Sequence, residues 1–273
     1  MFTTIQDGGR KGLAYYGIPP SGFMDRASAQ TANILVGNSK NAALLEMTYI
    51  GAQIYFEEEA VIAITGADMQ AQVNQEKIKT YQTIFIEKET TLQFKNSISG
   101  VRTYLAIHGK WKLTKHYKSS ATYTYAKMGG LNGNPIQKND VIEIQNINQD
   151  VHYIDLPPQF NWNEITKITL QKGPEWKFLN NPDQIKNEFS ISPQNDRMGA
   201  LLSGEAIDIN IPNAFPSQAV FPGVVQCTPS GKLIVVLQDG QTTGGYPRIG
   251  IIPRENLNLF NQLRIGKVFK FEI

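Results

Sequence analysis

The sequence predicts a mainly β protein made of two β-rich halves with a few short helices. Short apolar segments recur along the chain, and turn residues such as glycine, proline and asparagine separate them. Such regular spacing of short strands is typical of a β-barrel or a sandwich. The 273 residues suffice for one large or two ordinary domains with a real core.

The composition excludes several classes of protein. Charged residues make up 18% of the chain, apolar residues 41%, and the net charge is +2. Neither a disordered chain nor a polybasic nucleic-acid-binding surface is therefore predicted. The single cysteine, Cys227, excludes an intramolecular disulfide and fits a reducing compartment. Because no signal pattern opens the chain and no window approaches about eighteen apolar residues, we expect a cytoplasmic protein.

The first half is predicted to hold one helix and a series of strands. Residues 25–38 have the pattern of a helix, with Asp25 as its N-cap and Gly37-Asn38 as its stop. Its small apolar face should pack against a sheet and consists of Ala29, Ala32, Leu35 and Val36. Loops are expected at 4–12 and 17–22, and strands at 44–48, 53–56, 60–64, 83–86, 91–94, 102–107 and 140–144.

A domain boundary is predicted between Pro157 and Pro158, because paired prolines force extended backbone and few contacts cross such a segment. It divides the chain into 1–157 and 158–273. In the second part, Pro174 suits the first position of a helix. Strands are expected at 167–171, 219–221, 224–227, 233–237, 249–252 and 267–273, and a short helix near 254–262.

One loop of the second half is a candidate binding site. It runs from Asp239 to Arg248, between a strand predicted to be buried on both faces and the strand at 249–252. Gly244 and Gly245 would let the backbone take positive φ and approach a ligand or a partner closely. Threonine hydroxyls, backbone N–H groups and Arg248 could donate to an anion. The alternative is a simple hairpin connection.

Other polar residues are weaker candidates. Asp7 and Arg10 flank a glycine pair, where they could clamp each other or leave the arginine free for a carboxylate or phosphate. Asp68 follows Gly66 at the rim of a strand, as a ligand contact or, more simply, as an Asx-turn. Cys227 is most simply a core residue. The three histidines are too scattered for a metal motif, and no phosphate loop, dinucleotide fingerprint or serine nucleophile elbow is present.

Eight motifs in order support a resemblance to a known family. They are Thr4-Ile-Gln-Asp-Gly-Gly-Arg10, Gly22-Phe-Met-Asp25, Ala32-Asn-Ile-Leu-Val-Gly-Asn38, Asn41-Ala-Ala-Leu-Leu-Glu46, Thr65-Gly-Ala-Asp68, Asp196-Arg-Met-Gly199, Pro222-Gly-Val-Val-Gln226 and Gln241-Thr-Thr-Gly-Gly-Tyr-Pro-Arg248. Together they resemble the biotin-dependent carboxyltransferase-like family, also called allophanate hydrolase subunit 2, which includes KipA and the C component of the ATP-hydrolysing 5-oxoprolinase.

The resemblance implies two cyclophilin-like β-barrel subdomains and a KipI-like partner protein, the B component of the oxoprolinase. Together with a LamB/YcsF-like protein, the A component, such pairs convert 5-oxo-L-proline to L-glutamate at the expense of ATP. We expect ATP to be shared with the KipI-like partner. We expect no covalent biotin on this chain, because the lysine of Ala126-Lys127-Met128 lacks the preceding methionine of a biotinyl hairpin. There are two alternatives. One is a KipA-like regulator that binds a kinase inhibitor, and the other is the carboxyltransferase component of a biotin-dependent urea carboxylase.

The expected site follows from these motifs and contains no metal. Catalytic or charge-partner roles are predicted for Asp7, Arg10, Asp68, Asp196, Arg197 and Arg248. Substrate or nucleotide contacts are predicted for Gln226, Gln241, Thr242, Thr243, Gly244, Gly245 and Tyr246, since a developing negative charge needs preorganised donors.

Four features depart from the family pattern. The chain begins at Met1-Phe2, where relatives usually carry a further short strand. Lys110 follows Gly109 in place of a second glycine, and Leu201 replaces an arginine. The usual Gly-Ser-Arg-Ser-Thr is Lys118-Ser-Ser-Ala-Thr122, so Ser120 and Ala121 stand in for an arginine and a serine.

Overall fold

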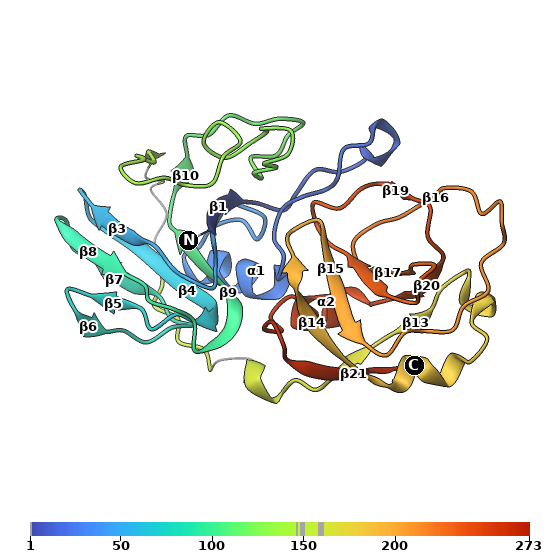
Figure 1. Cartoon of the computed structure of the whole chain (residues 1–273). Helices are drawn as coiled ribbons and strands as arrows, with labels where there is room; N and C mark the ends of the chain where they lie inside the picture. The colour runs from blue at the N-terminus through green and yellow to red at the C-terminus, as the bar shows by residue number, and fades with distance from the viewer. Residues whose placement is uncertain (1, 146, 148–150, 158–160) are drawn as a thin grey trace. The chain divides into compact units, whose positions relative to one another are not determined.

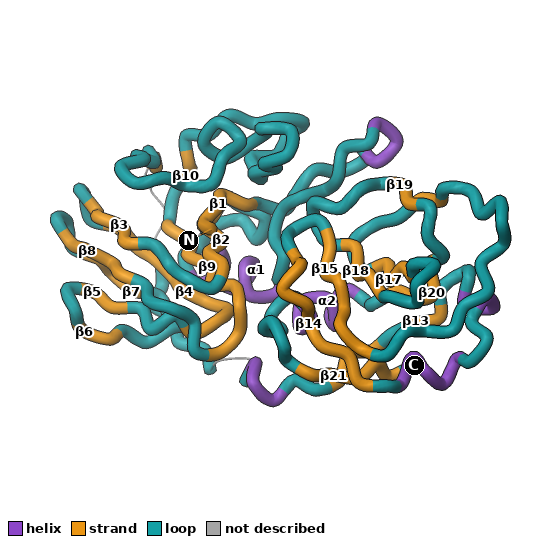
Figure 2. Tube along the Cα trace, viewed as in Figure 1, coloured by secondary structure: helices purple, strands orange, loops and turns teal. Residues whose placement is uncertain are grey.

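A computed structural model of the chain describes residues 2–145, 147, 151–157 and 161–273. It divides into two compact units (Figure 1). The first comprises Met1–Arg10 and Ser21–Asn163, and the second comprises Lys11–Pro20 and Glu164–Ile273. Strands dominate the regular structure, which confirms the predicted mainly β class (Figure 2). The boundary predicted at 157/158 falls on Pro158, which lies outside the described residues, and it stays a prediction.

The first unit contains a five-stranded sheet in the order β1-β2-β9-β4-β7, a four-stranded sheet in the order β3-β8-β5-β6, and the pair β10-β11. The strands are β1 (Phe2–Gln6), β2 (Leu44–Thr48), β3 (Gln53–Phe56), β4 (Ala60–Asp68), β5 (Gln72–Val73), β6 (Glu76–Lys77), β7 (Ile84–Ile86), β8 (Thr90–Gln93), β9 (Ser99–Ile107), β10 (Lys110–Trp111) and β11 (Ile144–Gln145).

The five-stranded sheet is buried on both faces, because successive side chains of a strand point to opposite sides. On one face, Leu45 and Leu105 share a core with Leu92 of the four-stranded sheet. On the other face, Leu44 and Tyr104 pack against the single α-helix described in this unit, α1 (Arg26–Leu35). The sheet is therefore the central layer of the unit.

Helix α1 matches its prediction closely. The Asp25 carboxylate accepts the N–H of Ser28 at 3.1 Å, which is the predicted N-cap. The face predicted to meet a sheet is fully buried and consists of Ala29, Ala32, Leu35 and Val36. The helix ends at Leu35, just before Gly37 takes a φ of 70°.

Three predictions for the first unit are wrong. The strand expected at 140–144 is limited to its last residue, because β11 is only Ile144–Gln145. Residues 4–6 are not a loop, because they form part of β1, which pairs with β2 along its length and buries Ile5 in the core. Gly66 does not end its strand either: β4 continues to Asp68 through an irregular pairing with β9. Gly66 has a φ of 87° there, and a Cβ would lie 2.4 Å from the carbonyl oxygen of Arg102, so only glycine fits this crossing.

The second unit is organised around an eight-stranded sheet in the order β12-β21-β14-β15-β18-β17-β20-β13. Its two edge strands, β12 and β13, are separated in the chain only by Leu170, so the two edges of the sheet must come together. The sheet is thus nearly closed into a barrel. The strands are β12 (Lys167–Thr169), β13 (Gln171–Lys172), β14 (Glu188–Asn195), β15 (Gly199–Gly204), β16 (Gln218–Ala219), β17 (Val224–Cys227), β18 (Leu233–Val236), β19 (Thr243–Gly244), β20 (Arg248–Ile251) and β21 (Val268–Glu272).

Strands β16 and β19 form a separate two-stranded sheet. The predicted helix near 254–262 is α2 (Arg254–Phe260). Pro174 does not open a helix, because the next 3-10 turn begins at Trp176. Neither helix of the described residues is long and apolar enough to cross a membrane.

The connection between β18 and β20 is not a hairpin. Both strands pair with β17, which lies between them in the sheet. Residues 239–247 therefore cross over the end of β17, and Cys227 on that strand is buried, as predicted.

Candidate functional site

The predicted site residues are divided between the two units. Asp7, Arg10 and Asp68 belong to the first, and all the others belong to the second. Each group is described by itself.

In the first unit, Asp7 and Arg10 hold the segment 119–122. The buried Asp7 carboxylate accepts the Ser119 hydroxyl and the Ser120 N–H, each at 2.6 Å, and the Gly9 N–H at 2.8 Å. The Arg10 guanidinium donates to the carbonyl oxygen of Ala121 at 2.5 Å. Both side chains therefore order backbone and hydroxyl groups in a region with almost no solvent access.

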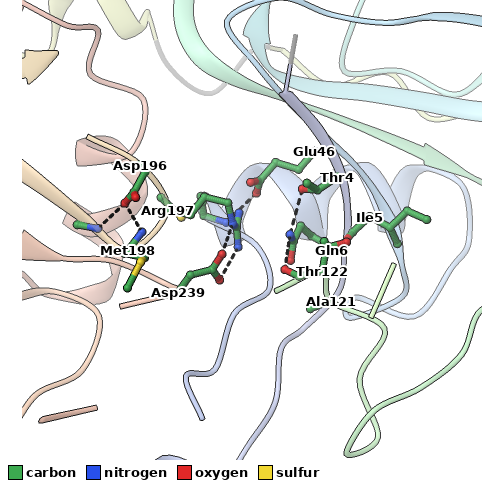
Figure 3. A network of polar contacts seen from close by, with 12 residues as sticks. Thr4, Ile5, Gln6, Glu46, Ala121, Thr122, Asp196, Arg197, Met198 and Asp239 are labelled. Carbon is green, nitrogen blue, oxygen red and sulfur yellow. Dashed lines mark hydrogen bonds and ion pairs between the residues drawn. The ribbon is translucent and has the colours of Figure 1, made fainter. Parts of the chain in front are cut away.

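The same segment is joined to β1 by polar contacts (Figure 3). Gln6 donates through its amide nitrogen to the Thr4 hydroxyl at 3.0 Å and to the Thr122 carbonyl at 3.1 Å, and the Thr122 hydroxyl donates to the carbonyl of Ile5 at 2.8 Å. Ser120, for which the resemblance implied an arginine, is buried within this network. The residue at this position thus lies inside a packed polar cluster.

A hollow of about 170 Å³ lies next to this cluster. It is lined by Lys112, Leu113, Thr114, His116 and residues 129–132. Its lining includes Gly129 and Gly130, which approach residues 120–122 too closely for a side chain. A Cβ on Gly129 would lie 2.1 Å from the Ala121 carbonyl oxygen, and one on Gly130 would lie 2.2 Å from the Thr122 hydroxyl. Sequence reasoning missed this hollow, although the Gly-Gly pair was a usable signal.

Asp68 forms an Asx-turn, the simpler of the two roles predicted for it. Its carboxylate accepts the N–H of Gln70 at 2.8 Å. This contact stabilises the chain reversal after β4.

In the second unit, Arg197 and Asp239 form a bidentate ion pair (Figure 3). The two Nε–Oδ2 and Nη2–Oδ1 distances are 2.8 and 3.2 Å, and the side chains are only 7% and 5% exposed. The Asp239 N–H also donates to the Arg197 carbonyl at 2.8 Å. This pair fixes the start of the 239–248 loop to the turn before β15.

Asp196 shapes that turn. Its Oδ1 accepts the N–H groups of Met198 and Gly199 at 2.7 and 3.1 Å (Figure 3). An open hollow of about 380 Å³ borders it, lined by Pro193, Gln194, Asn195, Asp196 and Gly199.

Arg248 has a carboxylate partner that sequence reasoning missed, Glu175. Nε and Nη2 of Arg248 each lie 2.9 Å from a Glu175 carboxylate oxygen, and the Arg248 N–H donates to the same carboxylate at 3.0 Å. The hydrogen bond from Arg248 holds the pKa of Glu175 below its ordinary value, and the same contact raises the pKa of Arg248. The pair ties the end of the loop, where β20 begins, to the segment that follows β13.

The middle of the loop is a short ribbon. Its Thr243–Gly244 strand, β19, pairs with β16, and the Val220 N–H donates to the Thr242 carbonyl at 3.0 Å. Nη1 of Arg248 donates a hydrogen bond to the carbonyl oxygen of Ala219, also at 3.0 Å. The guanidinium therefore connects the barrel to the far strand of the ribbon.

The two glycines of the loop have different roles. Neither has a positive φ, so the expectation of positive φ is wrong. Gly244 is needed for close approach, because a Cβ there would lie 2.6 Å from Nε2 of buried Gln226. That nitrogen in turn donates to the Tyr246 carbonyl at 3.0 Å. Gly245 is exposed, and a Cβ added to it would meet only the Ser217 hydroxyl, at 3.9 Å.

The second unit thus offers a rigid, exposed loop of backbone and hydroxyl groups, with Gln241, Thr243, Gly245 and Tyr246 at its surface. The cationic groups at its two ends, Arg197 and Arg248, are compensated by carboxylates. Such a loop suits hydrogen bonding to a small polar ligand or to another protein.

Comparison with known proteins identifies the class of protein that this fold defines. The chain belongs to the carboxyltransferase domain family, subdomains A and B, whose family model matches residues 16–273. The predicted resemblance is therefore confirmed.

Individual relatives include both enzyme types of the prediction. The chain is 31% identical over 274 residues to the C component of the 5-oxoprolinase of Escherichia coli, a match that covers 99% of this chain and 88% of that protein. It is 28% identical over 294 residues to the urea amidolyase of Saccharomyces cerevisiae, which covers 98% of this chain and 16% of that enzyme.

Solved structures share the fold over the whole chain. The crystal structure of TTHA0988 superposes with a TM-score of 0.88 and 28% identity, covering 100% of this chain and 54% of that chain, so this protein spans about half its length. The Kluyveromyces lactis urea carboxylase superposes with a TM-score of 0.89 and 25% identity, over 99% of this chain and 26% of that one.

Proposed function

We propose that this protein is the C component of an ATP-hydrolysing 5-oxoprolinase, which converts 5-oxo-L-proline to L-glutamate together with two other proteins. The observation that carries the proposal is the 31% identity to the C component of the Escherichia coli 5-oxoprolinase, in a match that takes in 88% of that relative. The match to urea amidolyase takes in only 16% of that enzyme. The partners are a KipI-like protein as the B component and a LamB/YcsF-like protein as the A component, in the cytoplasm.

In this proposal the chain contributes a rigid polar surface to a site completed by its partner. A lactam amide is a poor electrophile, and its activation builds negative charge on the carbonyl oxygen. Preorganised donors stabilise such charge without reorganising during the reaction. The exposed backbone around Gly245 and the hydroxyl of Thr243 are the donors that the chain offers, and Gln226 holds the Tyr246 carbonyl in place from below.

ATP is the co-substrate of the proposed reaction, but Arg197 and Arg248, the two arginines predicted for the site in the second unit, do not fit a triphosphate. Arg197 and Arg248 already bind Asp239 and Glu175 in bidentate pairs. Their positive charge is thereby largely compensated. Cations for the phosphates must therefore come chiefly from the KipI-like partner, and no step through ATP is assigned to this chain.

The proposal is tested by reconstitution. The purified chain with ATP and 5-oxo-L-proline should release no glutamate, and release should appear only when both the KipI-like and the LamB/YcsF-like proteins are added. Arg248→Ala should abolish release even at partner concentrations at which the complex assembles, because Arg248 fixes the end of the loop to Glu175 and to β16. Absence of glutamate from the full mixture would reject the function, and full activity of the variant would remove the loop from it.

A KipA-like regulator remains the second candidate. The exposed loop would then serve only as an interface. In that case the chain would bind the KipI-like protein and relieve its inhibition of a kinase, with no glutamate release in any mixture.

A further inference from the structure

The region around β16 and β19 is unusual in its lack of charge. No Asp, Glu, Lys, Arg or His occurs from Ile209 to Gly231 or from Gly240 to Pro247, although 18% of the whole chain is charged. Long uncharged stretches normally belong to buried strands. Residues 224–227 are such a strand, but much of 209–222 and 241–246 is exposed.

These two exposed segments lie side by side and form one face, here called the ribbon surface, residues 209–222 and 241–246. Gln218 pairs with Gly244, and Ala219 pairs with Thr243 (Figure 1). The exposed side chains on this surface include Phe221 at 51% and Tyr246 at 41%. Ala214, Pro216 and Thr243 are exposed as well. Aromatic groups and an absence of charge are the signature of the centre of a protein interface.

The ribbon surface is also held rigid. Arg248 donates to the Ala219 carbonyl from the barrel side and is itself fixed by Glu175. Gln226 holds the Tyr246 carbonyl. Prolines at 212, 216 and 222 restrict the longer segment further. A surface ordered before binding loses little conformational entropy when a partner docks, which favours affinity.

The chemistry of the surface selects its occupant. An uncharged face offers nothing to an anionic lipid surface or to a nucleic acid, and its complement is an uncharged protein face with apolar groups. One exposed lysine, Lys177, lies at its edge over the ring of Phe178. Phe178 packs edge to face on Phe215 of the surface at 5.8 Å. A partner would therefore present an apolar centre and acidic groups on that side.

We infer that the ribbon surface docks the KipI-like protein. This inference rests on the proposed function for the identity of the partner. The support for it is the face itself, which is exposed, uncharged and preformed, carries Phe221 and Tyr246, and is bordered by the cationic Lys177.

Charge insertion tests the inference. Phe221→Glu and Ala214→Glu place a carboxylate in the ribbon surface, at positions outside the proposed substrate contacts. Ile273→Glu is the matched control, because Ile273 is 49% exposed and belongs to neither segment. Titration calorimetry with the purified KipI-like protein should show the two surface variants binding at least about tenfold more weakly than the parent chain, with the control unchanged. Thermal unfolding of each variant, within about two degrees of the parent, establishes that folding is intact.

A measurement on the unmodified complex makes the test independent of the variants. Amide hydrogen exchange should slow in 209–222 and 241–246 when the KipI-like protein is added. Unchanged exchange there, unchanged affinity of folded Phe221→Glu and Ala214→Glu, or no binding of the KipI-like protein to the parent chain would each overturn the inference. A complex that forms through this surface but releases no glutamate would leave the docking surface in place and reject only the proposed enzyme function.

Discussion

The Glu175–Arg248 pair leads to a quantitative prediction for the free energy of unfolding of the Glu175→Gln variant. The substitution keeps the shape of the side chain but removes the charge that faces three donors of Arg248, at 2.9, 2.9 and 3.0 Å. The two side chains are 11% and 18% exposed, so solvent compensates the remaining guanidinium only in part. A hydrogen bond to a charged group contributes roughly 1.5–3 kcal/mol to stability, and removing one partner of a fully buried ion pair costs more. We expect a loss of about 2–3 kcal/mol of unfolding free energy.

The pH dependence of that loss has a defined sign. Arg248 lowers the folded-state pKa of Glu175, whereas the unfolded value is about 4.3. The carboxylate therefore contributes stability that is fully present above the unfolded pKa and is lost as pH falls through the folded pKa. The difference between parent and variant should be constant above about pH 5 and shrink below about pH 4.

Urea unfolding from pH 7 to pH 3 measures this difference. Asp183→Asn is the control, because Asp183 pairs with Lys186 at the surface, where the side chains are 81% and 63% exposed, and its loss should change stability little. A Glu175→Gln protein as stable as Asp183→Asn at pH 7, or a difference that persists undiminished to pH 3, would refute the role assigned to the pair.

Three further predictions concern the second unit. Asp239→Asn should destabilise the protein by about 3–5 kcal/mol in urea unfolding at pH 7, because it leaves the buried Arg197 charge without its bidentate carboxylate. Gly244→Ala should lower the melting temperature, since the new methyl group meets the glutamine beneath it, whereas Gly245→Ala should not, and equal effects would contradict the contacts at the loop. Burial raises the pKa of the Cys227 thiol to about 11, so a thiol reagent at pH 8 should modify it only on unfolding; rapid native labelling would contradict its core position.

The local features of the fold could be predicted from the sequence. Helix α1 needs only the cap at Asp25, an apolar face and a glycine stop, all of which lie within a few residues of one another. The barrel strands β17 and β18 lie at their expected positions, and β18 is a continuous apolar run. Periodicity and caps are enough for such elements because the interactions that define them are short in sequence.

Long-range contacts account for the errors. Strand β1 has the local pattern of a loop because Thr3, Thr4 and Gln6 are polar, yet all three are buried. Thr4 and Gln6 find their hydrogen-bond partners in each other and in Thr122, which lies 116 residues from Gln6. The partner of Arg248 is 73 residues distant. No local pattern marks such pairs, so sequence reasoning named Arg248 as a site residue without finding Glu175.

The compensated arginines lead to a last prediction, on ATP binding by the isolated chain. If the triphosphate recruited Arg197 or Arg248 alone, a bidentate carboxylate contact would have to break, at a cost of about 3–5 kcal/mol for the buried Arg197–Asp239 pair and about 2–3 kcal/mol for the partly exposed Arg248–Glu175 pair. Even the smaller cost corresponds to a loss of at least about thirtyfold in affinity. Calorimetry should therefore detect no ATP binding to the isolated chain at millimolar nucleotide and clear binding to its complex with the KipI-like protein. Submillimolar ATP affinity of the chain alone would show that its own groups suffice, and the partner would then not be needed to supply the cations.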